Sequence, residues 1–170
     1  MELIAAVDRR WGIGYKGQLL ARVRGDLRHF KTLTEGKTVI LGSNTLLTFP
    51  DSKPLKNRKN VILHPDASYK VEGATVLHST DELLEYVAAR PDEKFIVIGG
   101  ASVYRQLLPY CDEAFITRFE RTFEADAFFE DLDALPDFRL ASQSEPMLSD
   151  PATDTVGDMP YVFLVYRRIR

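Results

Sequence analysis

The chain has 170 residues, the length of one ordinary domain, because a single hydrophobic core usually serves roughly 100–200 residues. Hydrophobic residues make up 45% and charged residues 28% of the chain, which excludes a disordered or fibrous protein. Its 22 basic and 25 acidic side chains give a net charge of −3, so the chain lacks the basic field that holds nucleic acid. We therefore expect one globular domain over residues 1–170 and no nucleic-acid partner.

Cysteine content and hydropathy indicate the compartment. Cys111 is the only cysteine, so neither an internal disulfide nor a zinc site of clustered thiolates can form. No apolar run approaches the roughly 20 residues of a membrane span, and the run before Asp8 is too short for a signal peptide. No pair of histidines has the spacing of metal ligands. These features predict a cytoplasmic protein with no metal and no membrane contact.

Short apolar runs alternate with turn residues and helical patterns through much of the chain, which is typical of an α/β fold. The runs lie at residues 3–7, 38–42, 60–63, 74–77 and 95–99. Residues 39–41 and 95–98 are apolar without alternation, as in central strands that are covered on both faces. A largely parallel sheet is therefore predicted.

Three helices are expected between these strands, at residues 25–34, 79–90 and 101–108. The second is the clearest, because Ser79 and Glu82 have the spacing of a capping box. Residues 113–120 and 161–169 are long and β-prone, which suggests late strands with antiparallel pairing at an edge. The sheet is thus expected to be mixed, and residues 142–160 to form a surface excursion.

Two glycine turns are candidate phosphate sites. Gly99 and Gly100 separate an apolar strand from a helix start, where free backbone N–H groups can face an anion. A tight turn that needs glycine for its dihedral angles explains this pair equally well. Residues 42–45 repeat the arrangement, so two helix starts could hold one pyrophosphate, which favours a dinucleotide. Neither turn has the spacing of a Rossmann fingerprint or a P-loop.

Asp26 is the most prominent candidate carboxylate. It opens a helix in which Leu27 and Phe30 are apolar, so its side chain could face a hydrophobic pocket and bind a flat, amidine-like heterocycle. Local sequence alone favours an ordinary surface aspartate at a helix N-terminus. Arg58 could bind a ligand carboxylate through its guanidinium, or could simply be solvated in a basic loop.

The order of these segments resembles the dihydrofolate reductase family. The segments are LIAAVDRRWGIGYKGQLL, GDLRHFKTLT, TVILGSNTLLTF, PLKNRKNVIL, FIVIGGASVYRQLLP, AFITRF and EADAFF. The match spans nearly the whole chain, and its specificity comes from order and spacing rather than from one motif. The resemblance implies a central, mostly parallel, eight-stranded mixed sheet flanked by helices. Such a fold binds a reduced nicotinamide dinucleotide beside a pteridine and needs no metal.

The resemblance also implies roles for individual residues. Asp26 would hydrogen-bond the pteridine ring and promote protonation at N5, with Thr117 supporting it, while hydride passes from nicotinamide to C6. Arg58 would hold the glutamate α-carboxylate of the substrate. The implied substrate contacts are Ile4, Ala5, Asp26, Leu27, Phe30, Phe49, Leu55, Arg58 and Thr117.

A larger group is implied to bind the cofactor. Its members are Ala6, Ile13, Gly14, Gly17, Gln18, Leu19, Gly42, Ser43, Asn44, Thr45, Leu63, His64, His78, Ile98, Gly99, Gly100, Ala101, Ser102, Val103 and Tyr104. Residues 14–19 would form a lid over the nicotinamide. Residues 42–45 and 99–104 would hold the pyrophosphate and the adjacent ribose.

The chain departs from the family at several positions. The family commonly has a Pro-Trp pair in the lid and a proline two residues before the acid, where this chain has Leu20-Ala21 and Arg24. Many members bind the 2′-phosphate of the cofactor with arginines, where this chain has Ser43 and Ser102. We expect NADPH as the cofactor, and these departures leave the use of NADH open.

The function expected from these observations is cytoplasmic reduction of dihydrofolate by a monomer, for one-carbon metabolism, which would make the protein an antifolate target. One alternative is a related-fold reductase of another pterin or of a ribosylamino-pyrimidine. Another is a noncatalytic nucleotide- or pterin-binding protein. Asp26, Arg58 and the two glycine turns favour the folate reductase.

Overall fold

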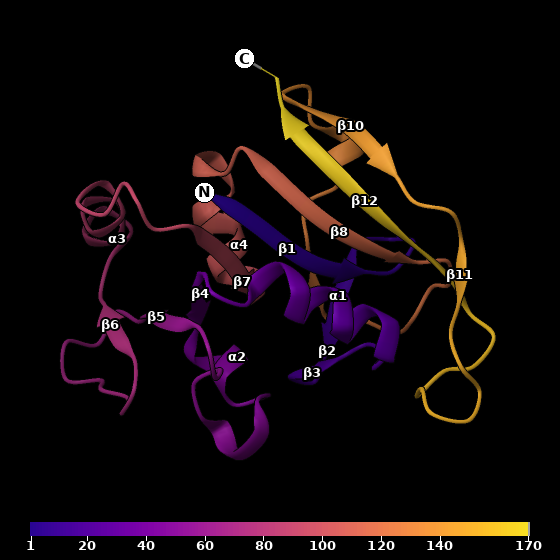
Figure 1. Cartoon of the computed structure of the whole chain (residues 1–170), viewed down its shortest axis with the longest axis horizontal. Helices are drawn as coiled ribbons and strands as arrows, with labels where there is room; N and C mark the ends of the chain where they lie inside the picture. The colour runs from indigo at the N-terminus through magenta and orange to yellow at the C-terminus, as the bar shows by residue number, and fades with distance from the viewer. Residues whose placement is uncertain (170) are drawn as a thin grey trace.

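A mixed sheet runs through the centre of the molecule, of which the computed structural model describes residues 1–169 (Figure 1). Eight strands follow one another in the order β10-β12-β8-β1-β7-β4-β5-β6, and β11 pairs with β12. The strands are β1 (Glu2–Val7), β4 (Thr38–Gly42), β5 (Lys59–Leu63), β6 (Thr75–Leu77), β7 (Phe95–Gly99), β8 (Glu113–Phe119), β10 (Phe138–Gln143), β11 (Met147–Leu148) and β12 (Pro160–Arg168). The pairs from β8 to β6 are parallel, whereas β12 is antiparallel to β8, β10 and β11. The predicted mixed, mostly parallel sheet is confirmed.

The sequence predicts that the strands β8 and β12 pair antiparallel at an edge of the sheet, and the structure differs from this prediction in two ways. β12 is antiparallel, but β8 runs parallel to β1, with Thr117 opposite Ala6. The helix before β8 forms a crossover from β7, and a crossover returns the chain in the same direction. Neither strand is at the edge, because β10 occupies that place.

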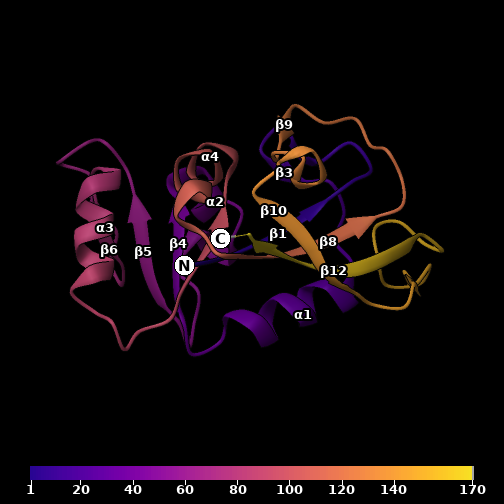
Figure 2. The same cartoon turned by 90° about the horizontal axis from the view of Figure 1, so that it is seen from above.

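Helices cover both faces of the sheet (Figure 2). They are α1 (Arg24–Thr34), α2 (Ser43–Leu46), α3 (Thr80–Ala88) and α4 (Ala101–Leu107), with single 3₁₀ turns η1 (Pro50–Ser52), η2 (Leu108–Tyr110) and η3 (Leu132–Ala134). All three predicted helices are present. Ser79 Oγ accepts a hydrogen bond from the backbone N of Glu82 at 3.1 Å, as the capping-box spacing predicts. Within the described residues, no helix is both long and apolar enough to cross a bilayer.

Alternate residues of the central strands feed two hydrophobic clusters. On β1, Leu3 and Ala5 belong to the cluster that packs against α3 and α4, whereas Ile4 belongs to the cluster that packs against α1. All three side chains are buried. Because both faces of the sheet are covered, its central strands are apolar without alternation.

The structure has a second, small sheet that the sequence analysis does not predict. It has the order β3-β2-β9, with β2 (Gly12–Tyr15), β3 (Gln18–Leu19) and β9 (Ala127–Phe128). Lys16 and Gly17 form the β2–β3 turn with φ angles of 50° and 77°. Two-residue strands are too short to show a periodic pattern, which explains the omission. The predicted excursion at residues 142–160 includes the end of β10 and all of β11.

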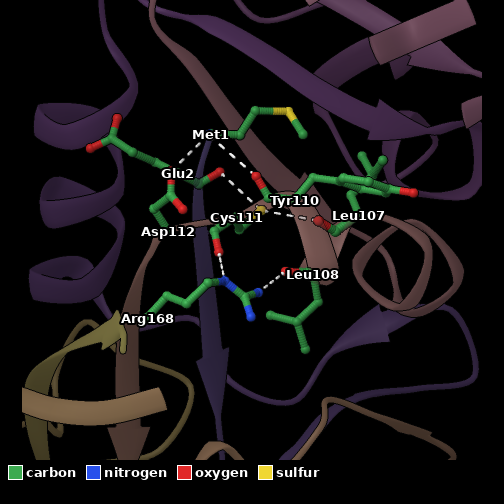
Figure 3. Close-up of polar contacts among 8 residues, drawn as sticks. All are labelled: Met1, Glu2, Leu107, Leu108, Tyr110, Cys111, Asp112 and Arg168. Atoms are coloured by element: carbon green, nitrogen blue, oxygen red, sulfur yellow. Dashed lines mark hydrogen bonds and ion pairs between the residues drawn. The ribbon is translucent and has the colours of Figure 1, made fainter. Parts of the chain in front are cut away.

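Arg168 of β12 forms hydrogen bonds to the connection between α4 and β8 (Figure 3). Arg168 donates from Nε to the carbonyl oxygen of Cys111 at 2.9 Å and from Nη2 to that of Leu108 at 2.7 Å. The Cys111 thiol donates to the carbonyl oxygen of Leu107 at 3.3 Å, and burial raises its pKa to about 11. Cys111 is therefore a neutral core group rather than a nucleophile.

Candidate functional site

A cleft of about 740 Å³ opens beyond the carboxyl ends of β4, β5 and β7. In α/β proteins this edge of the sheet is where ligands usually bind. The cleft is bordered by the β2–β3 hairpin, by the starts of α2 and α4, and by the residues that follow β5 and β6. One face of the molecule thus brings together segments from most of the chain.

The two predicted glycine turns lie side by side in this cleft. Gly42 is the N-cap of α2 and Gly100 is the N-cap of α4, and neither helix start has a side-chain cap. A Cβ on Gly100 would lie 3.2 Å from Oγ1 of Thr45, so the two turns approach each other closely. The first N–H groups of a helix have no partner within the helix. Two sets of such donors therefore border one space, which suits a pyrophosphate.

Gly99 explains why the second turn needs glycine. Its φ is +123°, a conformation that other residues rarely adopt, and its peptide bond to Gly100 is cis. Tyr104, one turn into α4, donates from its hydroxyl to the carbonyl oxygen of Ile4 at 2.7 Å. This buried bond fixes α4 against β1. Burial, with a smaller contribution from the charge of Asp26, raises the pKa of Tyr104, so the phenol stays a neutral donor.

Asp26 lies in the first turn of α1, beside the centre of β8. Its side chain is partly buried and is hydrogen-bonded by the side chain of Thr117. Burial raises the pKa of Asp26 to about 6, while the bond from Thr117 lowers it. The carboxyl group can therefore exchange a proton near neutral pH, which suits general acid–base chemistry.

The predicted apolar wall forms on the α1 side of the sheet. Phe30, Phe49 and Leu55 pack against the same cluster as Ile4. Leu27 lies in the same helix turn as Asp26 and is 39% exposed. Ala5 differs from the prediction, because its side chain packs in the cluster on the opposite face of the sheet. Successive residues of a strand point to opposite faces, so Ile4 and Ala5 cannot both face α1.

Arg58 is oriented by contacts within the chain. Its Nε donates to the carbonyl oxygen of Lys56 at 2.8 Å, and its Nη1 donates to Oγ1 of Thr34 at 3.0 Å. Thr34 Oγ1 donates in turn to the carbonyl oxygen of Phe30 at 2.8 Å. The guanidinium is thus held against Thr34, the last residue of α1, and Asp26 lies at the other end of that helix. Nη2 of Arg58 is available for a ligand carboxylate.

The β2–β3 hairpin is anchored by the segment that contains β9. Asp126 donates from its backbone N to the carbonyl oxygen of Gly14, and its Oδ2 accepts from the backbone N of Lys16, both at 3.0 Å. The hydroxyl of Tyr15 donates to Oε1 of Glu124, also at 3.0 Å. These bonds place the predicted lid along one side of the cleft.

Comparison with known proteins agrees with this geometry. The family model for dihydrofolate reductase matches residues 1–168. The chain belongs to the dihydrofolate reductase family. Dihydrofolate reductase of Staphylococcus aureus strain Mu50 is 32% identical over 164 residues, which cover 96% of this chain and 95% of that protein. The enzyme of Bacillus subtilis strain 168 is 31% identical over 168 residues, covering 99% of this chain and 94% of the relative.

A solved structure of a third member has the same fold. Dihydrofolate reductase from Enterococcus faecalis, complexed with NADP(H) and RAB-propyl, superposes with a TM-score of 0.84 at 31% identity. The similarity covers 99% of this chain and 96% of that one. The resemblance inferred from the order of sequence segments is therefore confirmed.

Every residue that the family resemblance assigns to the cofactor lines the cleft. The cleft has further walls outside that group, namely Thr48, Pro65, Ser79, Arg105, Gln106, Asp126 and Ala127. Arg105 and Gln106 lie one helical turn after Ala101 and Ser102, so helical spacing could have found them. Asp126 has no such signal, because the pairing of β9 with β2 brings it to the cleft. Within residues 1–169, no three His, Cys, Asp or Glu side chains form a metal site.

Proposed function

We propose that this protein reduces 7,8-dihydrofolate to tetrahydrofolate with NADPH, for one-carbon metabolism. The membership of the dihydrofolate reductase family over residues 1–168 supports the reaction, and the likeness to an enzyme complexed with NADP(H) supports the cofactor. The observation that carries the proposal is the partly buried Asp26, hydrogen-bonded by Thr117, whose partner across the sheet, Ala6, lines a cleft with two uncapped helix starts. A noncatalytic binding protein does not need the carboxyl group of Asp26, and Arg58 favours a folate, which carries a glutamate carboxylate, over a phosphorylated sugar substrate.

The residues present fit a dinucleotide across the cleft. The N–H groups at the starts of α2 and α4 would hold the pyrophosphate. Ala6, Ile13 and residues 14–19 would enclose the nicotinamide, and Leu63, His64 and His78 would lie along the adenosine half. This order follows the order of the strands, since β7 and β4 lie between β1 on one side and β5 and β6 on the other. When bound, the cofactor supplies the hydride.

Asp26 and Thr117 would act on the pteridine ring. A carboxyl group with a pKa of about 6 can hydrogen-bond the amidine-like edge of the ring and promote protonation at N5. Thr117 would keep the carboxyl group in place and favour its charged form. Catalysis by Asp26 would therefore depend on its burial at the start of α1.

The rest of the substrate would lie along α1. Ile4, Leu27, Phe30, Phe49 and Leu55 would contact the pterin and aminobenzoyl rings, with Ala5 contributing only its backbone. Arg58 would bind the glutamate α-carboxylate through the part of its guanidinium that is free of internal bonds. Exclusion of water by the β2–β3 hairpin would protect the reacting rings.

The assembly and location are part of the same proposal. We expect one domain that acts as a monomer in the cytoplasm, with small-molecule ligands and without nucleic acid. The net charge of −3 and the single buried cysteine support this assignment.

The direct test is oxidation of NADPH by the purified protein in the presence of dihydrofolate. Parallel reactions replace dihydrofolate with another dihydropterin or with a ribosylamino-pyrimidine, and replace NADPH with NADH. Turnover that requires dihydrofolate supports the proposal. Turnover only with a pyrimidine substrate supports the related-fold reductase, and folded protein that binds NADPH without turnover supports the noncatalytic alternative.

A further inference from the structure

The loop of residues 149–158, between β11 and β12, lies against the chain that leads into α1. In Figures 1 and 2 this yellow loop lies beside the first turn of the purple helix α1. The backbone N of Arg22 donates to Oγ1 of Thr155 at 2.9 Å, and the backbone N of Thr155 donates to the carbonyl oxygen of Arg22 at 3.1 Å. Two reciprocal bonds therefore join segments that are far apart in the sequence.

Asp154 supplies the helix cap that α1 lacks locally. The N-cap residue of α1 is Val23, whose side chain cannot accept a hydrogen bond. Oδ1 of Asp154 accepts from the backbone N of Arg24 at 2.9 Å, and Oδ2 accepts from the backbone N of Asp150 at 2.7 Å. The bond from Arg24 contributes most to holding the pKa of Asp154 below its usual range. An ionised carboxylate thus caps the helix that carries Asp26.

The backbone N–H of Arg24, which donates to Asp154, is present because this chain departs from the family pattern at residue 24. Where the family commonly has proline two residues before the acid, this chain has Arg24. Proline has no backbone N–H, so it could not donate to Asp154. A member of the family with proline at this position could not form the hydrogen bond between residue 24 and Asp154.

Apolar packing holds the same turn from a second side. Val23 and Met159 are fully buried in one cluster, to which Tyr161 also belongs. A Cβ on Gly25 would overlap the hydroxyl of Tyr161, so the backbone of α1 lies directly against this ring. The polar contacts from the loop to this turn come from Asp154 and Thr155.

We propose that Asp154 is a positioning residue for the reaction, which holds the first turn of α1 through the amide of Arg24 and so keeps Asp26 buried against Thr117. The proposal rests on the proposed role of Asp26. Asp26 lies two residues after Arg24 in the same helical turn, so fraying of that turn would move it.

Loss of the hydrogen bond between Asp154 and Arg24 should change how the rate of hydride transfer depends on pH. Burial is the main cause of the raised pKa of Asp26, so water admitted by a frayed turn would lower that pKa. The ionisable groups that interact with Asp26 are Tyr104 of α4 and Tyr161 of β12. Burial raises the pKa of both phenols, and Arg28 only partly opposes this at Tyr161, so both stay neutral and leave the titration to Asp26.

The experiment measures the rate of hydride transfer in single turnovers against pH, with the full-length chain saturated with NADPH and dihydrofolate. For Asp154→Ala we expect the apparent pKa to fall by about one unit, which lowers the rate above pH 7 about tenfold because the protonated fraction falls by that factor. Asp154→Asn keeps an oxygen that accepts from Arg24, so we expect a profile near that of the wild type. Glu145→Ala removes one charge from an exposed neighbouring segment and should leave the profile unchanged.

A second variant removes the other partner of the same bond. Arg24→Pro deletes the N–H at the first helical position, where proline fits well, and Val23 already has the extended conformation that precedes proline. Its profile should shift as in Asp154→Ala, whereas Arg24→Gln, which keeps the N–H, should not shift. If folded Arg24→Pro and Asp154→Ala proteins both retain the wild-type apparent pKa, the positioning role is wrong. An inactive wild type would instead overturn the proposed function.

Discussion

Thr117 hydrogen-bonds Asp26 from the middle of β8, where its neighbours across the sheet are Ala6 of β1 and Phe163 of β12. A residue paired on both sides has a rigid backbone, so its hydroxyl meets the carboxyl group at a fixed place. The relationship joins a centrally paired strand of the sheet to the first turn of α1. The hydrogen bond favours the ionised form of Asp26 and so opposes the larger effect of burial on its pKa.

Replacing Thr117 by valine should raise the apparent pKa of hydride transfer above about 6. The hydrogen bond from Thr117 favours the ionised form of Asp26, so its loss favours the protonated form. A pH profile of single-turnover rates checks the shift, and Thr117→Ser, which keeps a hydroxyl, serves as the control. A downward shift in Thr117→Val would contradict the assigned contact.

Replacing Arg58 by leucine should raise the KM for dihydrofolate about tenfold with little change in kcat, because a contact to the glutamate is the same before and during the reaction. Steady-state kinetics check this split. A dihydropterin without the glutamate tail should show no change in KM. Lys56→Leu is the matched control, since Lys56 meets Arg58 only through its backbone carbonyl. An unchanged KM in Arg58→Leu would remove this residue from the site.

Replacing Ser43 by arginine should strengthen the preference for NADPH. Among residues 1–169, Arg105 is the one Lys or Arg side chain that lines the cleft, and Ser43 lies at the start of α2 within it. A new charge-assisted bond to the 2′-phosphate contributes about 1.5 kcal/mol, so the ratio of KM for NADH to KM for NADPH should rise about tenfold. Ser43→Gln should leave the ratio unchanged. An equal gain for both cofactors would show that Ser43 is remote from the 2′ position.

Replacing Gly25 by alanine should lower the free energy of unfolding by about 1–3 kcal/mol, as overpacking does in well-packed interiors. The new Cβ would overlap the hydroxyl of Tyr161, whose ring is held by contacts with Phe119 and Phe163. Chemical denaturation measures the loss. Adding Tyr161→Phe should restore part of the stability, because the nearest remaining ring carbon would lie 3.2 Å from the Cβ. A stable Gly25→Ala protein would contradict this packing.

The sequence predicts the parts of the fold that local patterns encode. The three long helices and the apolar central strands are found at the predicted residues, because capping and hydrophobic periodicity are local properties. The direction of β8 and the small sheet of β2, β3 and β9 are not encoded locally. They depend on the crossover through α4 and on pairing between distant short segments.

In the site, too, some features are predictable from local sequence and others depend on contacts between distant segments. Glycine and hydroxyl residues after apolar strands predict the two helix starts, and both border the cleft. The burial of Asp26 is not predictable from its neighbours, which favour a surface aspartate. Nor is its hydrogen bond from Thr117 predictable, because Thr117 lies on β8, a strand far along the chain. The cap from Asp154 is likewise a tertiary contact, made by a loop whose sequence shows only turn residues.

The most direct test of the central claim is the pH dependence of hydride transfer in the wild type and in Asp26→Asn. The wild-type rate should fall as pH rises through about 6, because the protonated fraction of Asp26 falls there. Asp26→Asn should keep the fold and bind NADPH, yet lose the inflection near pH 6 and be at least about 100-fold slower at pH 8. An Asp26→Asn enzyme with the wild-type rate and the wild-type profile would show that Asp26 is not the acid of this site.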